Sequence, residues 1–190
     1  PKQYLPLADR TVIEHTLETL LQYPLIKAVM VVISPTDEYW PELVFNSDKP
    51  IWTTSGSNER QHSVLNGLTA LRPHADPDDW ILVHDAARPC LTDADLDTLI
   101  STLEQDEVGG LLASPVRDTM KRADPNQRIQ TTESRDGLWH ALTPQMFRFH
   151  ALFQALSEAV KNNLQVTDEA SAIEALGLAP KLVQGLSLIH

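Results

Sequence analysis

The sequence has little positive charge, a single cysteine and no long apolar run. Its 190 residues include 15 Lys and Arg against 26 Asp and Glu, which gives a formal net charge of −11. This acidic balance argues against a nucleic-acid partner, because such proteins need a basic footprint to displace counterions. The lone Cys90 excludes an internal disulfide and a zinc site built from cysteines.

Other absences narrow the possibilities further. No stretch approaches the roughly 20 apolar residues of a membrane helix, and Pro1–Tyr4 does not resemble a signal peptide. We therefore expect a cytoplasmic protein with no membrane partner. The sequence also lacks the motifs GxGxxG, GxxxxGK[ST] and GxSxG. Their absence argues against a dinucleotide-binding site, a P-loop and the nucleophile elbow of hydrolases. Apolar residues make up 42% of the chain, which predicts one globular domain over residues 1–190.

Apolar residues at helical spacing alternate along the chain with short β-branched runs. Lys27–Ser34, for example, is apolar on both faces, which is typical of a strand buried between helices. This alternation predicts an α/β fold with a mostly parallel, twisted sheet flanked by helices. The expected helices are Thr11–Tyr23, Asn58–Leu71, Thr92–Leu103, Phe149–Lys161 and Thr167–Leu176. The expected strands are Lys27–Ser34, Ile51–Thr54, Trp80–His84, Gly109–Pro115 and Lys181–Gln184, and Leu138–Leu142 returns the chain from an inserted segment.

That inserted segment, Val116–Asp136, is rich in Arg, Asp, Thr and Gln. Two candidate strands, Thr119–Arg122 and Arg128–Thr132, are separated by the turn formers Asp124–Asn126. We therefore predict a protruding β-hairpin arm. An exposed two-stranded hairpin is marginally stable alone, so we expect it to pack on the same arm of a second copy.

The segment Trp80–Cys90 carries the strongest chemical signal. Four apolar strand residues run directly into His84 and Asp85, and Arg88 follows. Ligands of open parallel sheets bind at the carboxyl ends of the strands, where Asp85 could hold Mg²⁺ and Arg88 an anionic or polyhydroxylated substrate. The alternative is that Asp85 forms an Asx turn with Arg88 as its surface partner, and that His84 is a hydrogen-bonded core residue.

Two further sets of polar residues permit a binding or a structural interpretation. Ser55–Arg60 joins a strand to a helix, with Ser63 one turn inside, so its backbone could bind a ligand or Ser57 and Asn58 could simply cap the helix. The arm residues could bind an anion or form an ordinary solvated charged face, and Lys2 could be a disordered terminal residue. The donors on the arm are Thr119, Lys121, Arg122 and Arg135.

Five segments in order closely resemble the 2-C-methyl-D-erythritol 4-phosphate cytidylyltransferase family, and the resemblance covers essentially the whole chain. They are Pro1–Leu5 (PKQYL), His84–Pro89 (HDAARP), Val116–Thr119 (VRDT), Leu138–Gln145 (LWHALTPQ) and Thr167–Ser171 (TDEAS). The resemblance implies a Rossmann-like nucleotidyltransferase fold and a homodimer built by the arm. It also implies transfer of CMP from CTP to methylerythritol phosphate, with Mg²⁺ as cofactor.

The resemblance also implies roles for particular residues. Lys2 would neutralise charge on the CTP triphosphate, and Asp85 would lie beside Mg²⁺ and the substrate hydroxyls. The CTP site would comprise Lys2, Gly56, Ser57, Asn58, Ser63, Asp85 and Ala86. Methylerythritol phosphate would be held by Asp85, Arg88 and Thr143, with Thr119 and Arg135 reaching across the dimer, so that two subunits share each active site.

The sequence also departs from the family pattern. The family opens with a strand and a glycine-rich loop that wraps the triphosphate, and after the position of Gly185 it carries an Asn-x-Lys segment where this chain reads Leu186–His190. We hypothesise that residues precede Pro1 and lie between Gly185 and Leu186. Two alternatives stay open: ribitol 5-phosphate cytidylyltransferase, whose relatives tend to carry Val at the position of Ala87, and a non-catalytic dimer that binds nucleotide weakly.

Overall fold

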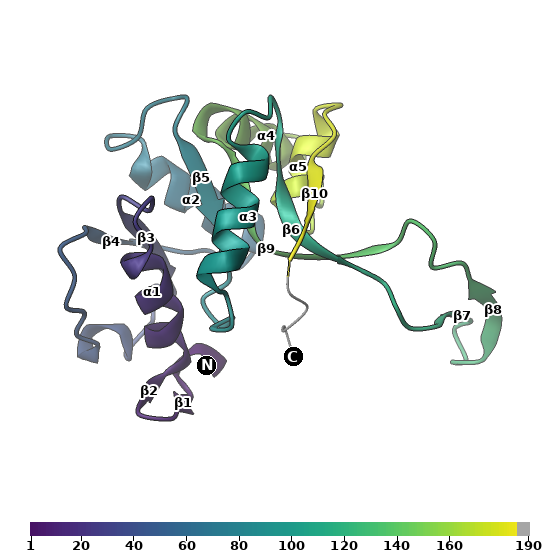
Figure 1. Cartoon of the computed structure of the whole chain (residues 1–190), viewed down its shortest axis with the longest axis horizontal. Helices are drawn as coiled ribbons and strands as arrows, with labels where there is room; N and C mark the ends of the chain where they lie inside the picture. The colour runs from purple at the N-terminus through teal and green to yellow at the C-terminus, as the bar shows by residue number, and fades with distance from the viewer. Residues whose placement is uncertain (186–190) are drawn as a thin grey trace.

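The computed structural model describes residues 1–185, so the sequence-based interpretation of Leu186–His190 lies outside the described residues. Figure 1 shows an α/β body with a long arm projecting from one side. The helices are α1 Val12–Gln22, α2 Arg60–Leu71, α3 Asp93–Leu103, α4 Phe149–Lys161 and α5 Glu169–Ala175, with short 3₁₀ turns η1 Lys2–Tyr4 and η2 Trp40–Glu42. None of the helices in this part of the chain is long and apolar enough to cross a membrane.

Within residues 1–185 the strands form four separate hydrogen-bonded groups. A four-stranded sheet has the order β10-β6-β9-β5, made of Lys181–Gln184, Gly109–Pro115, Trp139–Arg148 and Trp80–Val83. A parallel pair joins β3 Val29–Ile33 to β4 Ile51–Ser55. Antiparallel pairs join β1 Pro6–Leu7 to β2 Arg10–Thr11 and β7 Met120–Ala123 to β8 Ile129–Glu133. The predicted arm hairpin is thus confirmed, whereas the short β1–β2 hairpin was not predicted.

The four-stranded sheet is mixed, so the prediction of a mostly parallel sheet is confirmed only in part: β5, β6 and β10 run in one direction and β9 runs in the other. β6 pairs in parallel with β10, but β9 runs antiparallel to both β5 and β6. The physical reason is the connection: parallel neighbours need a long crossover, usually a helix, whereas the chain leaves β6 for the arm and returns directly beside it. β9 is also longer than the predicted Leu138–Leu142, since it spans ten residues and carries the chain from the arm to α4.

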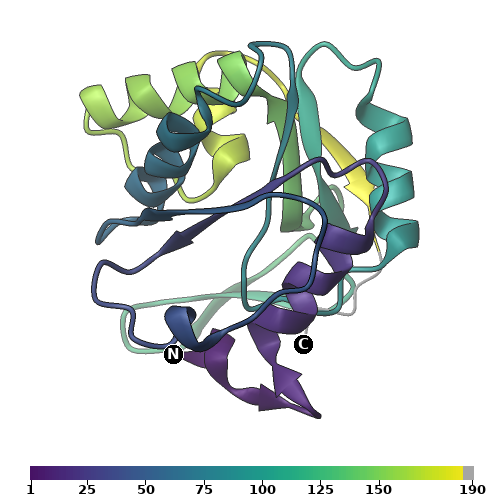
Figure 2. The same cartoon turned by 90° about the vertical axis from the view of Figure 1, so that its left-hand side faces the viewer.

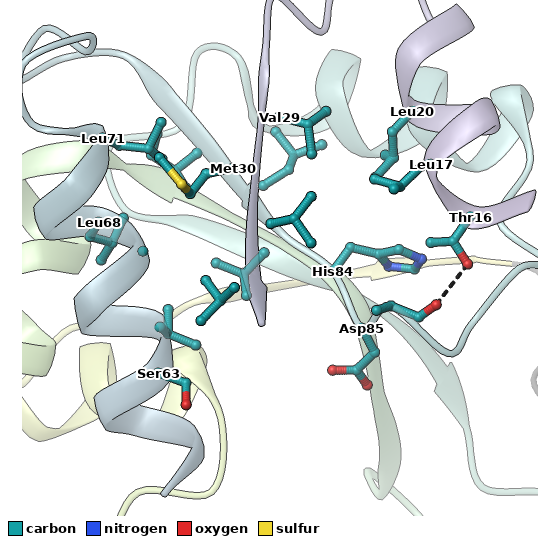
Figure 3. Close-up of a pocket in the computed structure, with 18 of the residues that line it drawn as sticks. Thr16, Leu17, Leu20, Val29, Met30, Ser63, Leu68, Leu71, His84 and Asp85 are labelled. Atoms are coloured by element: carbon teal, nitrogen blue, oxygen red, sulfur yellow. Dashed lines mark hydrogen bonds between the residues drawn. The ribbon is translucent and has the colours of Figure 1, made fainter. Parts of the chain in front are cut away.

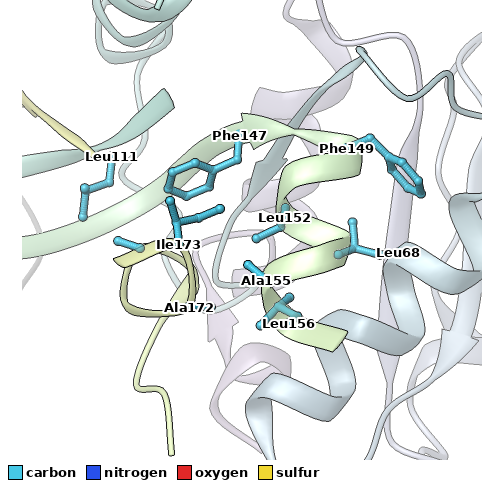
Figure 4. Packing of buried hydrophobic residues seen from close by; sticks show 10 residues of the cluster. Leu68, Leu111, Phe147, Phe149, Leu152, Ala155, Leu156, Ala172 and Ile173 are labelled. Atoms are coloured by element: carbon cyan, nitrogen blue, oxygen red, sulfur yellow. The ribbon is translucent and has the colours of Figure 1, made fainter. Parts of the chain in front are cut away.

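Helices cover both faces of the four-stranded sheet, as the pattern predicted. Figure 2 shows α2 and α4 on one side of the strands and α3 on the other. Neighbouring residues of a strand point to opposite faces, so Phe147 packs with Leu152 and Ile173, whereas Met146 packs with Leu99 and Leu103. Figure 4 shows the first of these clusters, in which Phe147 lies against Ile173. Burial of these side chains fixes β9 within the body.

Two glycines permit the close strand contacts at the start of β6. Gly109 has φ 101°, a conformation that disfavours other residues, and a Cβ there would lie 2.4 Å from the Met146 carbonyl oxygen. A Cβ on Gly110 would lie 2.1 Å from the Lys181 carbonyl oxygen. Any larger residue at either position would force β6 away from β9 or β10.

A cavity of about 270 Å³ separates the β3–β4 pair from the four-stranded sheet. Residues of β3 and β5 line its two sides, and α1 and α2 contribute Leu17 and Leu68. Figure 3 shows this apolar interior with Ser63 and Asp85 at one end. The strands β3 and β5 beside this cavity were predicted to be buried on both faces, but most of their residues are half-buried. In β3 only Val31 is buried, and in β5 no residue is buried.

Candidate functional site

The carboxylate of Asp85 lies immediately beyond the carboxyl end of β5, as predicted. Arg88 Nε donates to Asp85 Oδ2 at 2.7 Å, and the Arg88 backbone N–H donates to the Asp85 carbonyl oxygen at 3.1 Å. The turn therefore presents a carboxylate and a guanidinium side by side, each side chain 36% exposed. The surface pairing of Asp85 with Arg88, which was the alternative to a binding role, is thus present. Both side chains remain partly exposed, so the pairing does not exclude a ligand.

A second guanidinium, Arg60 at the start of α2, approaches the same carboxylate from the other side. Its Nη2 lies 3.7 Å from Asp85 Oδ1. Both Nη atoms also donate to the buried Glu169 carboxylate, at 2.5 and 2.9 Å. Burial disfavours the charged form of Arg60, but the bond to Glu169 outweighs it and raises the pKa of Arg60. Sequence reasoning gave neither residue a role, although both fall inside segments it had singled out.

His84 is a half-buried structural residue whose proton position can be deduced. Its Nε2 lies 3.0 Å from the Arg88 carbonyl oxygen, which can only accept, so Nε2 carries the proton. Burial lowers the pKa of His84, so the ring is neutral at pH 7 and Nδ1 is an acceptor. The Thr143 hydroxyl, 2.9 Å away, therefore donates to Nδ1. This agrees with the core interpretation of His84.

Thr143 thereby becomes part of the frame that holds Asp85. With its proton directed at His84, Thr143 Oγ1 accepts a long hydrogen bond of 3.4 Å from the Asp85 backbone N–H. β9 brings Thr143 to this position because Gln145, two residues on, pairs with Val83 of β5. The structure therefore joins the predicted site residues Asp85, Arg88 and Thr143 in one constellation.

The loop predicted to bind CTP follows β4 and is held by Ser63. The Ser57 backbone N–H donates to Ser63 Oγ at 2.9 Å, and the Gly56 N–H donates to the Ile33 carbonyl oxygen at 2.7 Å. A Cβ on Gly56 would lie 3.1 Å from Ser63 Oγ, so a larger residue would crowd this contact. Asn58 is exposed beside them. The four predicted residues thus form one loop and helix start, and neither Ser57 nor Asn58 is the N-cap, which is Glu59.

Two cavities meet at His84. Ser63, Asp85 and Ala86 line the first, where the Ala86 carbonyl oxygen accepts from Thr16 Oγ1 at 3.0 Å (Figure 3). The second, of about 420 Å³, is lined by Lys2 together with Arg88, Thr143 and several apolar side chains. Lys2 lies in η1 and is exposed. Lys2 thus lines the same cavity as Arg88 and contributes a cation there.

Thr119 and Arg135 do not join this constellation within one chain. Both are exposed and belong to the arm, which Figure 1 shows projecting away from the body. The Arg135 guanidinium donates to the Arg117 carbonyl oxygen across the base of the arm. Their predicted contact with substrate therefore requires a second copy of the chain.

Mg²⁺ takes oxygen ligands and accepts one or two carboxylates together with phosphate oxygens and water. Across residues 1–185, no three or more His, Cys, Asp or Glu side chains gather in a metal-binding arrangement. Asp85 Oδ1 makes an ion pair of 3.7 Å with Arg60 Nη2, which is longer than a hydrogen bond, and the Asp85 side chain is 36% exposed, so the carboxylate can also take a cation. The residues fit a cation shared between one carboxylate and a phosphate ligand.

Fold and site together define an α/β protein whose strand-end site suits an anionic ligand accompanied by a cation. Residues 1–188 match the family described as 2-C-methyl-D-erythritol 4-phosphate cytidylyltransferase, IspD. The chain belongs to this family, which confirms the prediction from the motifs. Curated relatives of that name include one from Aliivibrio fischeri, 51% identical over 97% of this chain and 77% of its own length. Another, from Pseudomonas putida, is 53% identical over 98% and 80%.

Solved structures agree with this assignment. The crystal structure of a 4-diphosphocytidyl-2C-methyl-D-erythritol synthase superimposes with a TM-score of 0.89 at 39% identity, covering all of this chain and 86% of that one. The Francisella tularensis 2-C-methyl-D-erythritol 4-phosphate cytidylyltransferase gives 0.86 at 35% identity, covering 97% and 83%. The fold is therefore that of the family.

Proposed function

We propose that the protein transfers CMP from CTP to 2-C-methyl-D-erythritol 4-phosphate, releasing pyrophosphate and forming 4-diphosphocytidyl-2-C-methyl-D-erythritol. The observation that carries this proposal is the family match over residues 1–188, with Asp85 of the matching HDAARP motif between two guanidinium groups at a strand end. A substrate phosphate oxygen attacks the α-phosphorus of CTP, and the bond from that phosphorus to the bridging oxygen breaks. Pyrophosphate leaves with the electron pair.

The chain's own residues supply positioning and charge for this reaction. The attacking phosphate is already an anion, so no general base is needed, and catalysis rests on orientation and on stabilising charge. Lys2 neutralises charge on the α-phosphate as it is attacked, a role supported by its presence in the same cavity as Arg88 and Thr143. Asp85 binds the cation and substrate hydroxyls, while Arg88 and Thr143 orient the polyol phosphate. Mg²⁺, when bound, would spread the negative charge of the phosphates and orient them.

The loop after β4 is the proposed site for the cytosine base. The backbone of Gly56, Ser57 and Asn58 supplies hydrogen-bonding groups, and Ser63 holds that backbone in place. Ala86 lines the same cavity as Ser63. Close contact between this loop and the base is consistent with the small residue at Gly56.

The arm is the proposed dimer contact, and the homodimer completes each active site. The arm strands are almost wholly exposed, and apolar side chains on and beside them face solvent, including Met120, Ile129, Leu138 and Trp139. A two-stranded hairpin with such residues needs a partner to be stable. In the dimer, Thr119 and Arg135 of one copy reach the polyol phosphate bound at Asp85 of the other.

The test is pyrophosphate release by the purified protein with CTP and Mg²⁺, offering methylerythritol 4-phosphate and ribitol 5-phosphate separately. Release with the former alone supports the proposal. Release with ribitol 5-phosphate alone would keep the cytidylyltransferase class and replace the substrate. No release with either, while CTP still binds, would favour the non-catalytic dimer. Asp85→Asn is the matched control, because it keeps the shape of the side chain and removes its charge.

A further inference from the structure

Arg60 links two carboxylates that differ strongly in exposure. The Glu169 side chain is fully buried, whereas the Asp85 side chain is 36% exposed and faces the site. Arg60 engages Glu169 with both Nη atoms, at 2.5 and 2.9 Å, yet stays 3.7 Å from Asp85 Oδ1. The guanidinium therefore forms its hydrogen bonds on the buried side and only approaches the site on the other.

The position of Glu169 is itself fixed by the sheet. Gln145 of β9, which is buried, donates from Nε2 to Asp168 Oδ2 at 2.9 Å and accepts the Ala170 backbone N–H at 2.8 Å. These two bonds bracket Glu169 in sequence and tie the start of α5 to the strand beside β5. Glu169 thus has little freedom to follow Arg60 toward the site.

We propose that Glu169 is a positioning residue that keeps Arg60 at the 3.7 Å ion-pair distance from Asp85 Oδ1, beyond hydrogen-bond distance, and so leaves this oxygen available to the cation of the CTP complex. The inference rests on the proposed function, which assigns Asp85 to that cation. Because Arg88 already occupies Oδ2 at 2.7 Å, capture of Oδ1 by Arg60 would leave the carboxylate with both oxygens bonded to guanidinium groups. A carboxylate in that state competes poorly for a divalent ion.

A purely structural role would make a different prediction. A buried ion pair can often be replaced by neutral residues of similar size with little loss of stability, whereas removing one partner alone is costly. If Glu169 only supported the packing of α5 on α2, its loss would disturb CTP binding with or without metal. If it restrains Arg60, its loss should matter only while Arg60 is present.

The test measures the dissociation constants of Mn²⁺·CTP and of metal-free CTP in EDTA by calorimetry. The variants are Glu169→Gln, Arg60→Met and the double variant, with Glu174→Gln as control because Glu174 is an exposed glutamate of the same helix. Glu169→Gln should weaken Mn²⁺·CTP about tenfold, the size of one charge-assisted hydrogen bond, and leave metal-free CTP within about twofold. The double variant should regain the wild-type preference for the metal complex.

Each other outcome overturns the inference. Equal weakening of both ligands, or a loss that persists in the double variant, would show that Glu169 acts through packing. Unchanged metal preference in Glu169→Gln would overturn the inference alone, whereas absence of metal preference in the wild type would also overturn the cation role of Asp85. Should Glu169→Gln fail to fold, Arg60→Lys provides the same test, since an ammonium cannot form the two-point bond and should likewise weaken Mn²⁺·CTP selectively.

Discussion

Gln145→Leu tests how strongly β9 holds α5 beside the site. Gln145 is 1% exposed and makes two short hydrogen bonds that leucine cannot make, one to the Asp168 carboxylate and one from the Ala170 N–H, besides a long one of 3.5 Å to the Leu142 carbonyl oxygen. Burial alone would raise the pKa of Asp168, but the hydrogen bonds from Gln145 and Ser171 outweigh it and lower that pKa. The Gln145 amide therefore stabilises the ionised form of Asp168.

The expected cost follows from these two bonds. Leaving the buried Ala170 N–H without a partner costs about 1–3 kcal/mol. Asp168 keeps its bond from the Ser171 N–H and is partly exposed, so its loss is nearer 1 kcal/mol. Burying the additional apolar surface of leucine returns about 1 kcal/mol. The free energy of unfolding should therefore fall by about 2 kcal/mol.

Urea denaturation at pH 7 measures this change. With a slope of about 2 kcal/mol per molar urea, the midpoint should fall by about 1 M. Gln154→Leu is the control, because Gln154 is an exposed glutamine of α4, and it should stay within about 0.5 kcal/mol of the wild type. A Gln145→Leu protein as stable as this control would refute the reasoning that these bonds anchor α5.

Further predictions concern the site, the arm and pH. Lys2→Ala and Asp85→Asn should each lower turnover by at least about a hundredfold with little change in melting temperature, because neither side chain is part of the core; normal turnover would remove the assigned role. Arg135→Ala should mainly raise the KM for the polyol phosphate, and mixing it with Asp85→Ala should restore on the order of a quarter of the sites if subunits share them; no recovery would mean that each protomer works alone. Burial lowers the pKa of His84 below its ordinary value of 6.5. As the pH falls below about 6.5, the unfolded chain therefore binds a proton at His84 before the folded protein does. The part of the free energy of unfolding that depends on this group, which is fully retained above about pH 6.5, is lost as the pH falls through the pKa of the folded state. His84→Gln should therefore flatten the decline in unfolding free energy between pH 7 and 5, and an unchanged slope would contradict the assignment of a neutral ring with a lowered pKa.

Local pattern was sufficient for most elements of the fold. The predicted bounds agree with the observed ones for the strands Gly109–Pro115 and Lys181–Gln184 and for the helix Phe149–Lys161. The spacing of apolar residues and the residues that end an element both lie within each of these segments, so a local pattern is enough to predict them. The direction of β9 was missed, since nothing within a strand specifies which neighbours it pairs with. The hairpin Pro6–Thr11 was missed because strands of two residues carry no periodicity.

The candidate site was predictable only where its residues share one segment. Asp85 and Arg88 lie three positions apart, so their pairing at a strand end could be expected from the sequence. Arg60 and Glu169 are separated by 109 positions, and each alone resembles an ordinary charged residue on a helix. Their bidentate pairing depends on α2 and α5 packing together, which is a tertiary event that no local pattern encodes.

The antiparallel course of β9 connects the arm to the site. The strand begins at Trp139, paired with Pro115 where the arm leaves the body, and within four residues it reaches Thr143, which holds His84 and the Asp85 backbone. Two residues later Gln145 fixes the start of α5 and hence Glu169. If β9 ran parallel to β5, its carboxyl-terminal residues would lie at the carboxyl end of β5 in place of Thr143 and Gln145. β9 runs antiparallel because the arm is inserted between β6 and β9, and this insertion therefore brings Thr143 and Gln145 close to Asp85.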